Sequence, residues 1–180
     1  MIPTCSGDTI GSISYFCVKN RFMKHIQHSA IEKAIDKIDN LDDDGLERVA
    51  ETFALAQPTL LGYVLSAAQE YENEQLEGLI IYYFCLVSEA FVQDQALMNV
   101  ISEEEIEAFE EPFFEMLDAY FDTDNEEFLN DFIDQPELVR FMMIEISTKD
   151  DDGSSLEDET ATQLFIVTSA MIALMNKAIK

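Results

Sequence analysis

The chain has 180 residues, with 37 acidic and 10 basic side chains and a formal net charge of −27 at pH 7. This charge repels nucleic acid and anionic membranes, so we expect neither to be bound directly, whereas a basic protein or a cation would be attracted. Hydrophobic residues make up 48% of the chain. That share is enough to bury a core, and we expect a single compact domain over residues 1–180.

The expected location is the cytoplasm. The N-terminus lacks the basic region followed by an apolar stretch that marks a signal peptide. No uninterrupted apolar run reaches the ~18–20 residues that span a bilayer. The three cysteines (Cys5, Cys17 and Cys85) are an odd number without a Cys-x-x-Cys spacing, so we expect reduced thiols.

Apolar residues recur at three- and four-residue steps along almost the whole chain, which predicts helices and no β-sheet. In the first half we expect helices over residues 8–38, 46–56, 58–70 and 74–95. A turn at 40–45, a glutamine–proline step and a polar break at 71–73 separate them. The fourth helix contains residues 79–91, the most apolar run, in which Glu89 is the only charge. We expect it to be the buried central helix.

In the second half we expect helices over residues 102–121, 126–133, 136–147 and 156–178. Ser102 and Glu105 fit a capping box at the start of the first of these helices. Asp124 and Glu127 have the same spacing and predict a second capping box. Pro112 is expected to kink or restart the helix that contains it, because proline removes a helical hydrogen bond.

The basic residues are unevenly distributed. Five of the ten lie in one early segment: Lys19, Arg21, Lys24, Lys33 and Lys37. No lysine or arginine occurs between Arg48 and Arg140. We therefore expect the first helix to form ion pairs with the acidic helices inside the protein. Such pairs contribute about 0–1 kcal/mol each when they are exposed.

An internal duplication is predicted by two glutamine–proline steps, at Gln57 and Gln135. The helices that follow them match without a gap. The matched pairs are Leu60 with Leu138, Leu61 with Val139, Tyr63 with Phe141, Val64 with Met142 and Leu65 with Met143. We therefore predict two similar four-helix units, roughly residues 14–95 and 102–178. They would form a helical bundle or a short α-solenoid-like stack. The alternative is that apolar periodicity alone aligns any two helices.

Two loops have the spacing of an EF-hand calcium site, with oxygen ligands at positions one, three and five, glycine at six and glutamate at twelve. The candidate ligands are Asn40, Asp42, Asp44 and Glu51 in the first loop, and Thr148, Asp150, Asp152 and Glu159 in the second. Neither loop has the usual aspartate at position one or an apolar residue at position eight. The alternative is a solvated turn that caps the next helix.

A second candidate metal set consists of His25, His28 and Glu32, which would share one face of the first helix. Two imidazoles and a carboxylate suit zinc or iron. No Glu-x-x-His or His-Glu-x-x-His motif accompanies them. The alternative is an exposed polar face without a ligand.

One segment is rich in aromatic residues and methionine and is wider than one buried helix face requires: Phe113, Phe114, Met116, Leu117, Tyr120 and Phe121. The candidate partner residues within it are Phe113, Phe114, Met116 and Tyr120. Core packing would account for most of it. Residues left over would form an apolar groove for a partner, or a homodimer surface, with acidic residues around it.

The sequence has no catalytic constellation and no glycine-rich phosphate loop, so we expect neither an enzyme nor a bound cofactor. The first hypothesis is an acidic interaction module, such as an inhibitor, an immunity-type protein or an adaptor, for a basic partner protein. A nucleic-acid mimic would be a variant of this hypothesis. The alternative is a helical domain that binds a metal ion or a small ligand.

Overall fold

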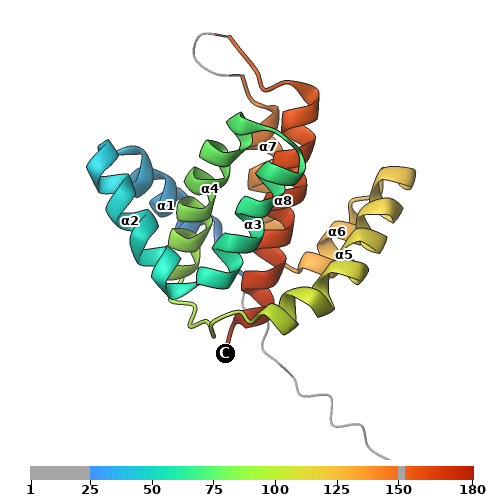
Figure 1. The fold of residues 1–180 in the computed structure, drawn as a ribbon, viewed down its shortest axis with the longest axis horizontal. Coiled ribbons are helices and arrows are strands. Elements are labelled where there is room, and N and C mark those ends of the chain that lie inside the picture. Colours follow the sequence, from blue (N-terminus) through green and yellow to red (C-terminus); the bar gives the residue numbers. More distant parts are fainter. Residues whose placement is uncertain (1–24, 150–152) are drawn as a thin grey trace, which may run out of the picture.

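The computed structural model describes residues 25–149 and 153–180, and in these residues the fold is all-α (Figure 1). They form eight helices and no β-strand, as the hydrophobic periodicity predicts. In chain order the helices are α1 (His28–Asp39), α2 (Asp43–Ala56), α3 (Pro58–Glu70), α4 (Glu74–Gln93), α5 (Glu103–Thr123), α6 (Glu127–Ile133), α7 (Pro136–Ser147) and α8 (Asp158–Ala178). An isolated bridge between Met98 and Ile179 ties the loop before α5 to the end of the chain.

The centre of the fold is a pair of parallel helices, α4 and α8, that pack side by side (Figure 1). Every residue from 83 to 91 in α4 is buried, which confirms that this apolar run is the central helix. α8 is buried from residue 163 to 175, apart from the half-buried Ile166. α3 and α7 pack against this pair. α1 and α2 flank α4, while α5 and α6 flank α8.

α4 is long and apolar enough, by length and composition, to cross a membrane. Polar residues spread along this helix interrupt its apolar run, so no uninterrupted run of spanning length occurs in the sequence. Within the qualifying window 61% of the residues are buried inside the fold, as in the central helix of a bundle. Cys85 lies in this helix and is fully buried, and its burial raises the pKa of the thiol to about 11.

Both glutamine–proline steps have the same backbone conformation, and the glutamine of each is buried. Gln57 has φ −138° and ψ 60°, Gln135 has φ −138° and ψ 67°, and each precedes a helix that begins at proline. The matched residues Leu60 and Leu138 are both fully buried. The two steps are therefore locally equivalent. The division of the chain into two similar four-helix units stays a prediction.

The first helix begins later than the sequence predicts. Within the described residues it starts at His28, and residues 25–27 precede it without helical structure. The backbone N–H of Ile26 donates to Oε1 of Gln135 at 2.8 Å, so a distant side chain takes the hydrogen bond that a helix would have used. The part of the predicted helix before residue 25 lies outside the described residues.

The helix ends in the second half differ in part from the prediction. The capping box of Ser102 and Glu105 is confirmed. The second capping box is wrong, because Asp124 has a left-handed conformation (φ 52°) and ends α5. α5 also runs through Pro112 without restarting. Pro112 and Ala108, whose carbonyl oxygen loses its helical partner, are both exposed to water.

One internal ion pair confirms the predicted role for Lys37, while Lys19, Arg21 and Lys24 lie outside the described residues. Nζ of Lys37 in α1 lies 2.7 Å from Oε2 of Glu89 in α4. Glu89 is 1% exposed, and its Oε1 also accepts a hydrogen bond from Nε2 of Gln93 at 2.6 Å. The single charge of the central apolar run is therefore neutralised where α1 packs on α4.

Candidate interaction surface

α5 carries an unusual density of one charge. It has no basic residue and nine acidic residues: Glu103, Glu104, Glu105, Glu107, Glu110, Glu111, Glu115, Asp118 and Asp122. Figure 1 shows that α5 starts near the end of α8 and leans away from the central pair, with α6 returning beside it. We refer to residues 103–133, which comprise α5, α6 and their connection, as the acidic arm.

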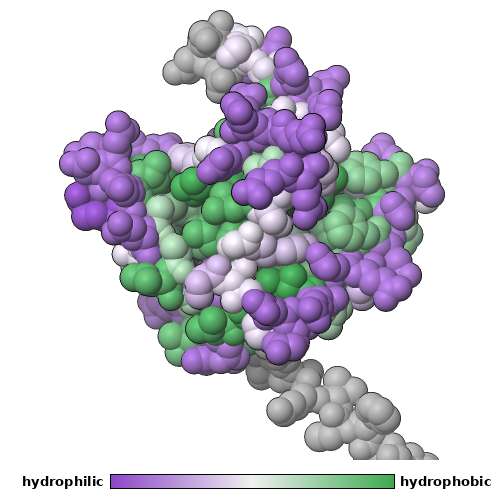
Figure 2. All heavy atoms as spheres, viewed as in Figure 1, coloured by the Kyte–Doolittle hydropathy of each residue, from purple (hydrophilic) through white to green (hydrophobic). Residues whose placement is uncertain are grey.

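The acidic arm also exposes aromatic side chains. Phe114 is 48% exposed, Phe121 is 53% exposed and Phe128 is 40% exposed. Figure 2 shows hydrophobic surface over the α5 side of this face, at the right of the view, bordered by hydrophilic residues. Exposed apolar surface with polar residues around it is typical of a site that binds another protein.

A groove of about 150 Å³ lies where the acidic arm meets α3 and α8, and we call it the aromatic groove. Its buried lining residues are apolar: Val64, Phe113, Val167 and Ala170. The more exposed lining residues are Tyr63, Glu70 and Tyr71 from α3 and its C-terminal end, Glu110 and Phe114 from α5, and Ile166 from α8. Residues of α3 and α5 thus present aromatic rings and two carboxylates to the same small space, and α8 adds apolar side chains.

The potential in the aromatic groove is negative. The pKa of Tyr63 is raised to about 12, first by burial and then by the carboxylates of Glu110 and Glu70. Burial and Glu70 also raise the pKa of Tyr71. Neither glutamate has an ion-pair or hydrogen-bond partner among the residues that the structure describes. A cation entering the groove would therefore meet two carboxylates that no base of the described residues neutralises.

The predicted partner residues divide between the core and the surface. Phe113 is fully buried and contributes only to the floor of the aromatic groove, and Met116 is 7% exposed, so Met116 is wrongly assigned to the partner surface. Phe114 is exposed, as predicted. Tyr120 is half-buried, with its ring centroid 5.8 Å from that of Phe165 in α8.

Phe121, which belongs to the aromatic run but was not among the candidate partner residues, is exposed, and it lies seven residues from Phe114 on the same side of α5. Phe128, Tyr63 and Tyr71 were not predicted from the sequence. The tyrosines could not be found from helical spacing, because their place in the groove depends on how α3 meets α5.

The chain matches no family model, no curated protein and no solved structure.

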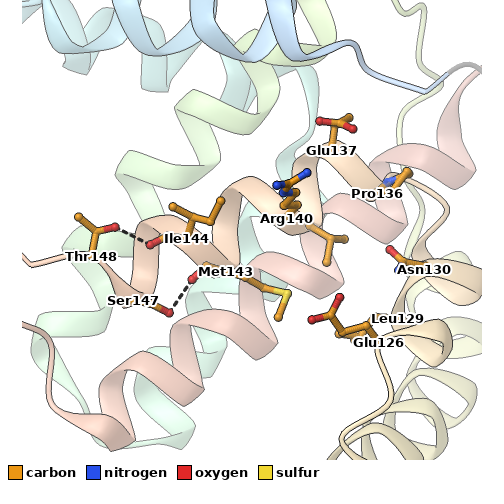
Figure 3. Close-up of a pocket in the computed structure, with 11 residues that line it drawn as sticks. Glu126, Leu129, Asn130, Pro136, Glu137, Arg140, Met143, Ile144, Ser147 and Thr148 are labelled. Carbon is orange, nitrogen blue, oxygen red and sulfur yellow. Dashed lines mark hydrogen bonds between the residues drawn. The ribbon is translucent and has the colours of Figure 1, made fainter.

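A second, larger groove of about 720 Å³ lies between α6 and α7. Figure 3 shows Met143 of α7 and Glu126 facing one another across it, with Arg140 and Glu137 farther along α7. This groove contains a base beside its acids, so its charge is mixed. It is a less selective site for a basic partner than the aromatic groove, where both charged groups are acidic.

The first candidate calcium loop does not have the geometry of a calcium site. α2 begins at Asp43, so most of the supposed loop, up to Glu51, is helical. Oδ1 of Asp42 accepts the N–H of Gly45 at 2.8 Å and caps this helix. Asn40 ends α1, and its Nδ2 donates to the carbonyl oxygen of Asp36. The calcium hypothesis for Asn40, Asp42, Asp44 and Glu51 is therefore wrong, and the capped turn is the correct alternative.

The second candidate calcium loop lies partly outside the described residues, since Asp150 and Asp152 belong to the segment 150–152. Thr148 ends α7, with Oγ1 donating to the carbonyl oxygen of Ile144 at 2.7 Å. Glu159 lies in the first turn of α8, and its Oε1 accepts a hydrogen bond from Gln163 at 3.2 Å. Calcium binding at Thr148, Asp150, Asp152 and Glu159 stays a prediction.

The candidate zinc or iron set is not assembled. His25 precedes α1, and its Nε2 lies 3.0 Å from Oδ1 of Asp134. His28 pairs instead with Glu32 along α1, at 3.6 Å and in an exposed position. In the described part of the chain, no group of three or more histidine, cysteine, aspartate or glutamate side chains has the geometry to hold a metal ion. His28 and Glu32 therefore lie together, but His25 is paired elsewhere and the predicted three-residue set is not formed.

Proposed function

We propose that this protein is a non-catalytic interaction module that binds a basic partner protein on the acidic arm and the adjoining aromatic groove. The observation that carries the proposal is the exposure of Phe114 and Phe121 on a helix with nine acidic residues and no basic one. Acidic groups would attract and orient the partner, while the apolar rings would supply the contact area that holds it.

A basic amphipathic helix is the partner segment that fits this surface best. Such a helix presents apolar residues on one face and lysine or arginine on the flanks, and it docks its apolar face into a groove. The acidic arm has the complementary arrangement, with phenylalanine rings among carboxylates. An inhibitor, an immunity-type protein or an adaptor could each use such a surface.

A second copy of this chain is a weaker candidate for the same surface. Dimerisation through the acidic arm would bring two α5 helices, each with nine acidic residues, against one another. Like charges placed together in this way cost several kcal/mol unless cations intervene. The metal-ion alternative now depends on the second candidate calcium loop, because the other two sets lack the required geometry.

The test is the association rate of a lysine-rich amphipathic helical peptide with two matched double variants. Glu111→Lys with Glu115→Lys reverses two exposed charges one helical turn apart on α5. Glu47→Lys with Glu51→Lys makes the same change on exposed positions of α2. The net charge of the protein changes equally in both. We expect the α5 variant to slow association about tenfold at low salt, and the α2 variant to slow it less than about twofold.

The salt dependence of the rate separates this proposal from a general attraction. The rate for the unaltered protein should fall steeply with ionic strength, and the α5 variant should show a shallower fall. Equal slowing by the two double variants would mean that net charge alone acts, and would overturn the proposed surface. Failure of the peptide to bind the unaltered protein at low salt would overturn the proposed function.

A further inference from the structure

The aromatic groove has the dimensions of a receptor for a single side chain. Its volume of about 150 Å³ lies well below the ~300–1,000 Å³ of pockets that take cofactors or drug-sized ligands. The aromatic groove is too small to hold a whole helix. A partner helix lying along the acidic arm would therefore place one side chain inside the groove. The groove is thus a separate element within the larger surface.

The walls of the aromatic groove select for an organic cation on an apolar stem. Tyr63 and Tyr71 border it on the α3 side and Phe114 on the α5 side, while Glu70 and Glu110 add one carboxylate from each helix. An ammonium or guanidinium group is attracted both by the faces of aromatic rings and by carboxylates. The buried residues Val64, Val167 and Ala170 provide an apolar floor for methylene groups.

This fold already holds one ammonium group against aromatic rings of the acidic arm. Nζ of Lys177 in α8 lies 4.9 Å from the ring centroid of Phe109 and 4.7 Å from that of Phe132. The contact lies at the other side of the junction between α5 and α8, and it is internal to the chain. It demonstrates that the geometry of a cation over an aromatic ring is compatible with this packing. The aromatic groove offers a similar environment, and none of its described lining residues is a lysine.

We propose that the aromatic groove receives one lysine or arginine side chain of the basic partner, with the charged head between Glu70 and Glu110 and the stem against Tyr63, Tyr71 and Phe114. The identity of the occupant as a side chain of a basic partner rests on the proposed function. The binding of the cation itself can be measured without the partner.

The experiment follows amide chemical shifts in the ¹⁵N-labelled protein during titration with n-butylammonium, n-butylguanidinium and n-butanol at constant ionic strength. We expect saturable shifts for residues 63–71 and 110–114 with at least one of the two cations, and binding by butanol at least about fivefold weaker. The relative affinities of the two cations identify whether lysine or arginine is preferred. Shifts spread evenly over acidic helices, or equal affinity for butanol, would overturn the proposal.

A matched pair of substitutions locates the effect. Glu110→Gln removes a carboxylate that lines the groove, and Glu111→Gln removes its exposed neighbour on the same helix, which does not line it. We expect the first to weaken cation binding about threefold or more and the second to leave it within about 1.5-fold. Equal effects would overturn the proposal. If Glu110→Gln impairs folding, Glu70→Gln at an exposed position serves the same purpose.

The two proposals fail separately in these measurements. If the amphipathic peptide binds the acidic arm but butylammonium and butylguanidinium leave residues 63–71 unshifted, the cation receptor is wrong and the proposed function stands. If a cation binds the groove but the peptide does not bind at low salt, the receptor stands and the proposed function is wrong. A peptide with norleucine in place of each lysine in turn would identify the one that enters.

Discussion

Gln57 and Gln135 each hold the chain that enters the first helix of the opposite half of the protein. Gln57, before α3, accepts the backbone N–H of Ile101 ahead of α5 at 3.0 Å. Gln135, before α7, accepts the backbone N–H of Ile26 ahead of α1 at 2.8 Å. In both cases the bonded isoleucine lies two residues before its helix and is buried. The exchange is reciprocal, as expected for a pseudo-twofold arrangement.

Removing either glutamine should destabilise the fold. Gln57→Ala and Gln135→Ala each leave a buried backbone N–H without its acceptor, which costs about 1–3 kcal/mol. Gln69→Ala, at an exposed position of α3, is the control and should change the free energy of unfolding by less than about 0.5 kcal/mol. Urea unfolding measures all three. A loss at one glutamine but none at the other would contradict the reciprocal role.

The Lys37–Glu89 pair should couple α1 to α4. Lys37→Met leaves the carboxylate of Glu89 buried without its cation, and we expect a loss of about 2 kcal/mol, since Lys37 itself is 47% exposed. Lys33→Met, one turn earlier and exposed, should have little effect. The double variant Lys37→Met with Glu89→Leu should be more stable than the sum of the single losses predicts. Strict additivity in this double-mutant cycle would contradict direct coupling.

The titration of Tyr63 should report the carboxylates of the aromatic groove. Its pKa of about 12 is due first to burial and then to Glu110 and Glu70. Glu110→Gln should therefore lower this pKa, while Glu111→Gln should leave it unchanged. Ultraviolet absorbance of tyrosinate measures the pKa, with Tyr63→Phe identifying the signal. An identical response to both glutamate substitutions would place Tyr63 outside the influence of Glu110.

The raised pKa of Tyr63 also predicts how the stability of the fold changes with pH. The folded pKa of Tyr63 lies above the unfolded value of 10.0, so the folded state holds this proton more tightly. The protonated Tyr63 side chain therefore contributes fully to the free energy of unfolding below about pH 10. This contribution is lost as the pH rises toward about 12. Between these values the free energy of unfolding should fall less in Tyr63→Phe than in the unaltered protein. Parallel falls would contradict the assignment.

The exposed and the buried phenylalanines of α5 should separate binding from stability. Phe114→Ser with Phe121→Ser removes rings that are 48% and 53% exposed, so we expect stability to change by less than about 1 kcal/mol and peptide binding to weaken about tenfold. Phe113→Ala empties a fully buried position and should cost about 3–5 kcal/mol. Peptide affinity unchanged by the double serine variant would remove these rings from the binding surface.

Helix positions followed closely from the sequence, because local signals determine them. The proline after Gln57 and the proline after Gln135 begin α3 and α7, and the apolar run around Glu89 is the central helix. The start of α1 at His28 did not follow. It depends on a hydrogen bond from the backbone N–H of Ile26 to Gln135, which lies in the other half of the chain. A local sequence pattern cannot predict such a long-range contact.

Fewer residues of the candidate site than of the fold could be predicted from the sequence. Phe113 and Phe114 are neighbours of the same residue type, yet one is fully buried and the other 48% exposed. Which side of α5 faces the core depends on how the helix leans across α8, and hydrophobicity alone does not specify that. The loop at Asp42 had the residue types and spacing of a calcium site. A local alternative, the capping of α2, took the carboxylate instead.

The footprint of a basic helical peptide on this protein tests the central claim most directly. The ¹⁵N-labelled protein would be titrated with a lysine-rich amphipathic peptide at low salt, and the shifted amides would be mapped onto the eight helices of the described fold. We predict that the largest shifts fall on α5 from residue 110 to 121 and on α3 from residue 63 to 71. Shifts concentrated on α1 and α2, or spread evenly over all acidic helices, would contradict a binding surface on the acidic arm.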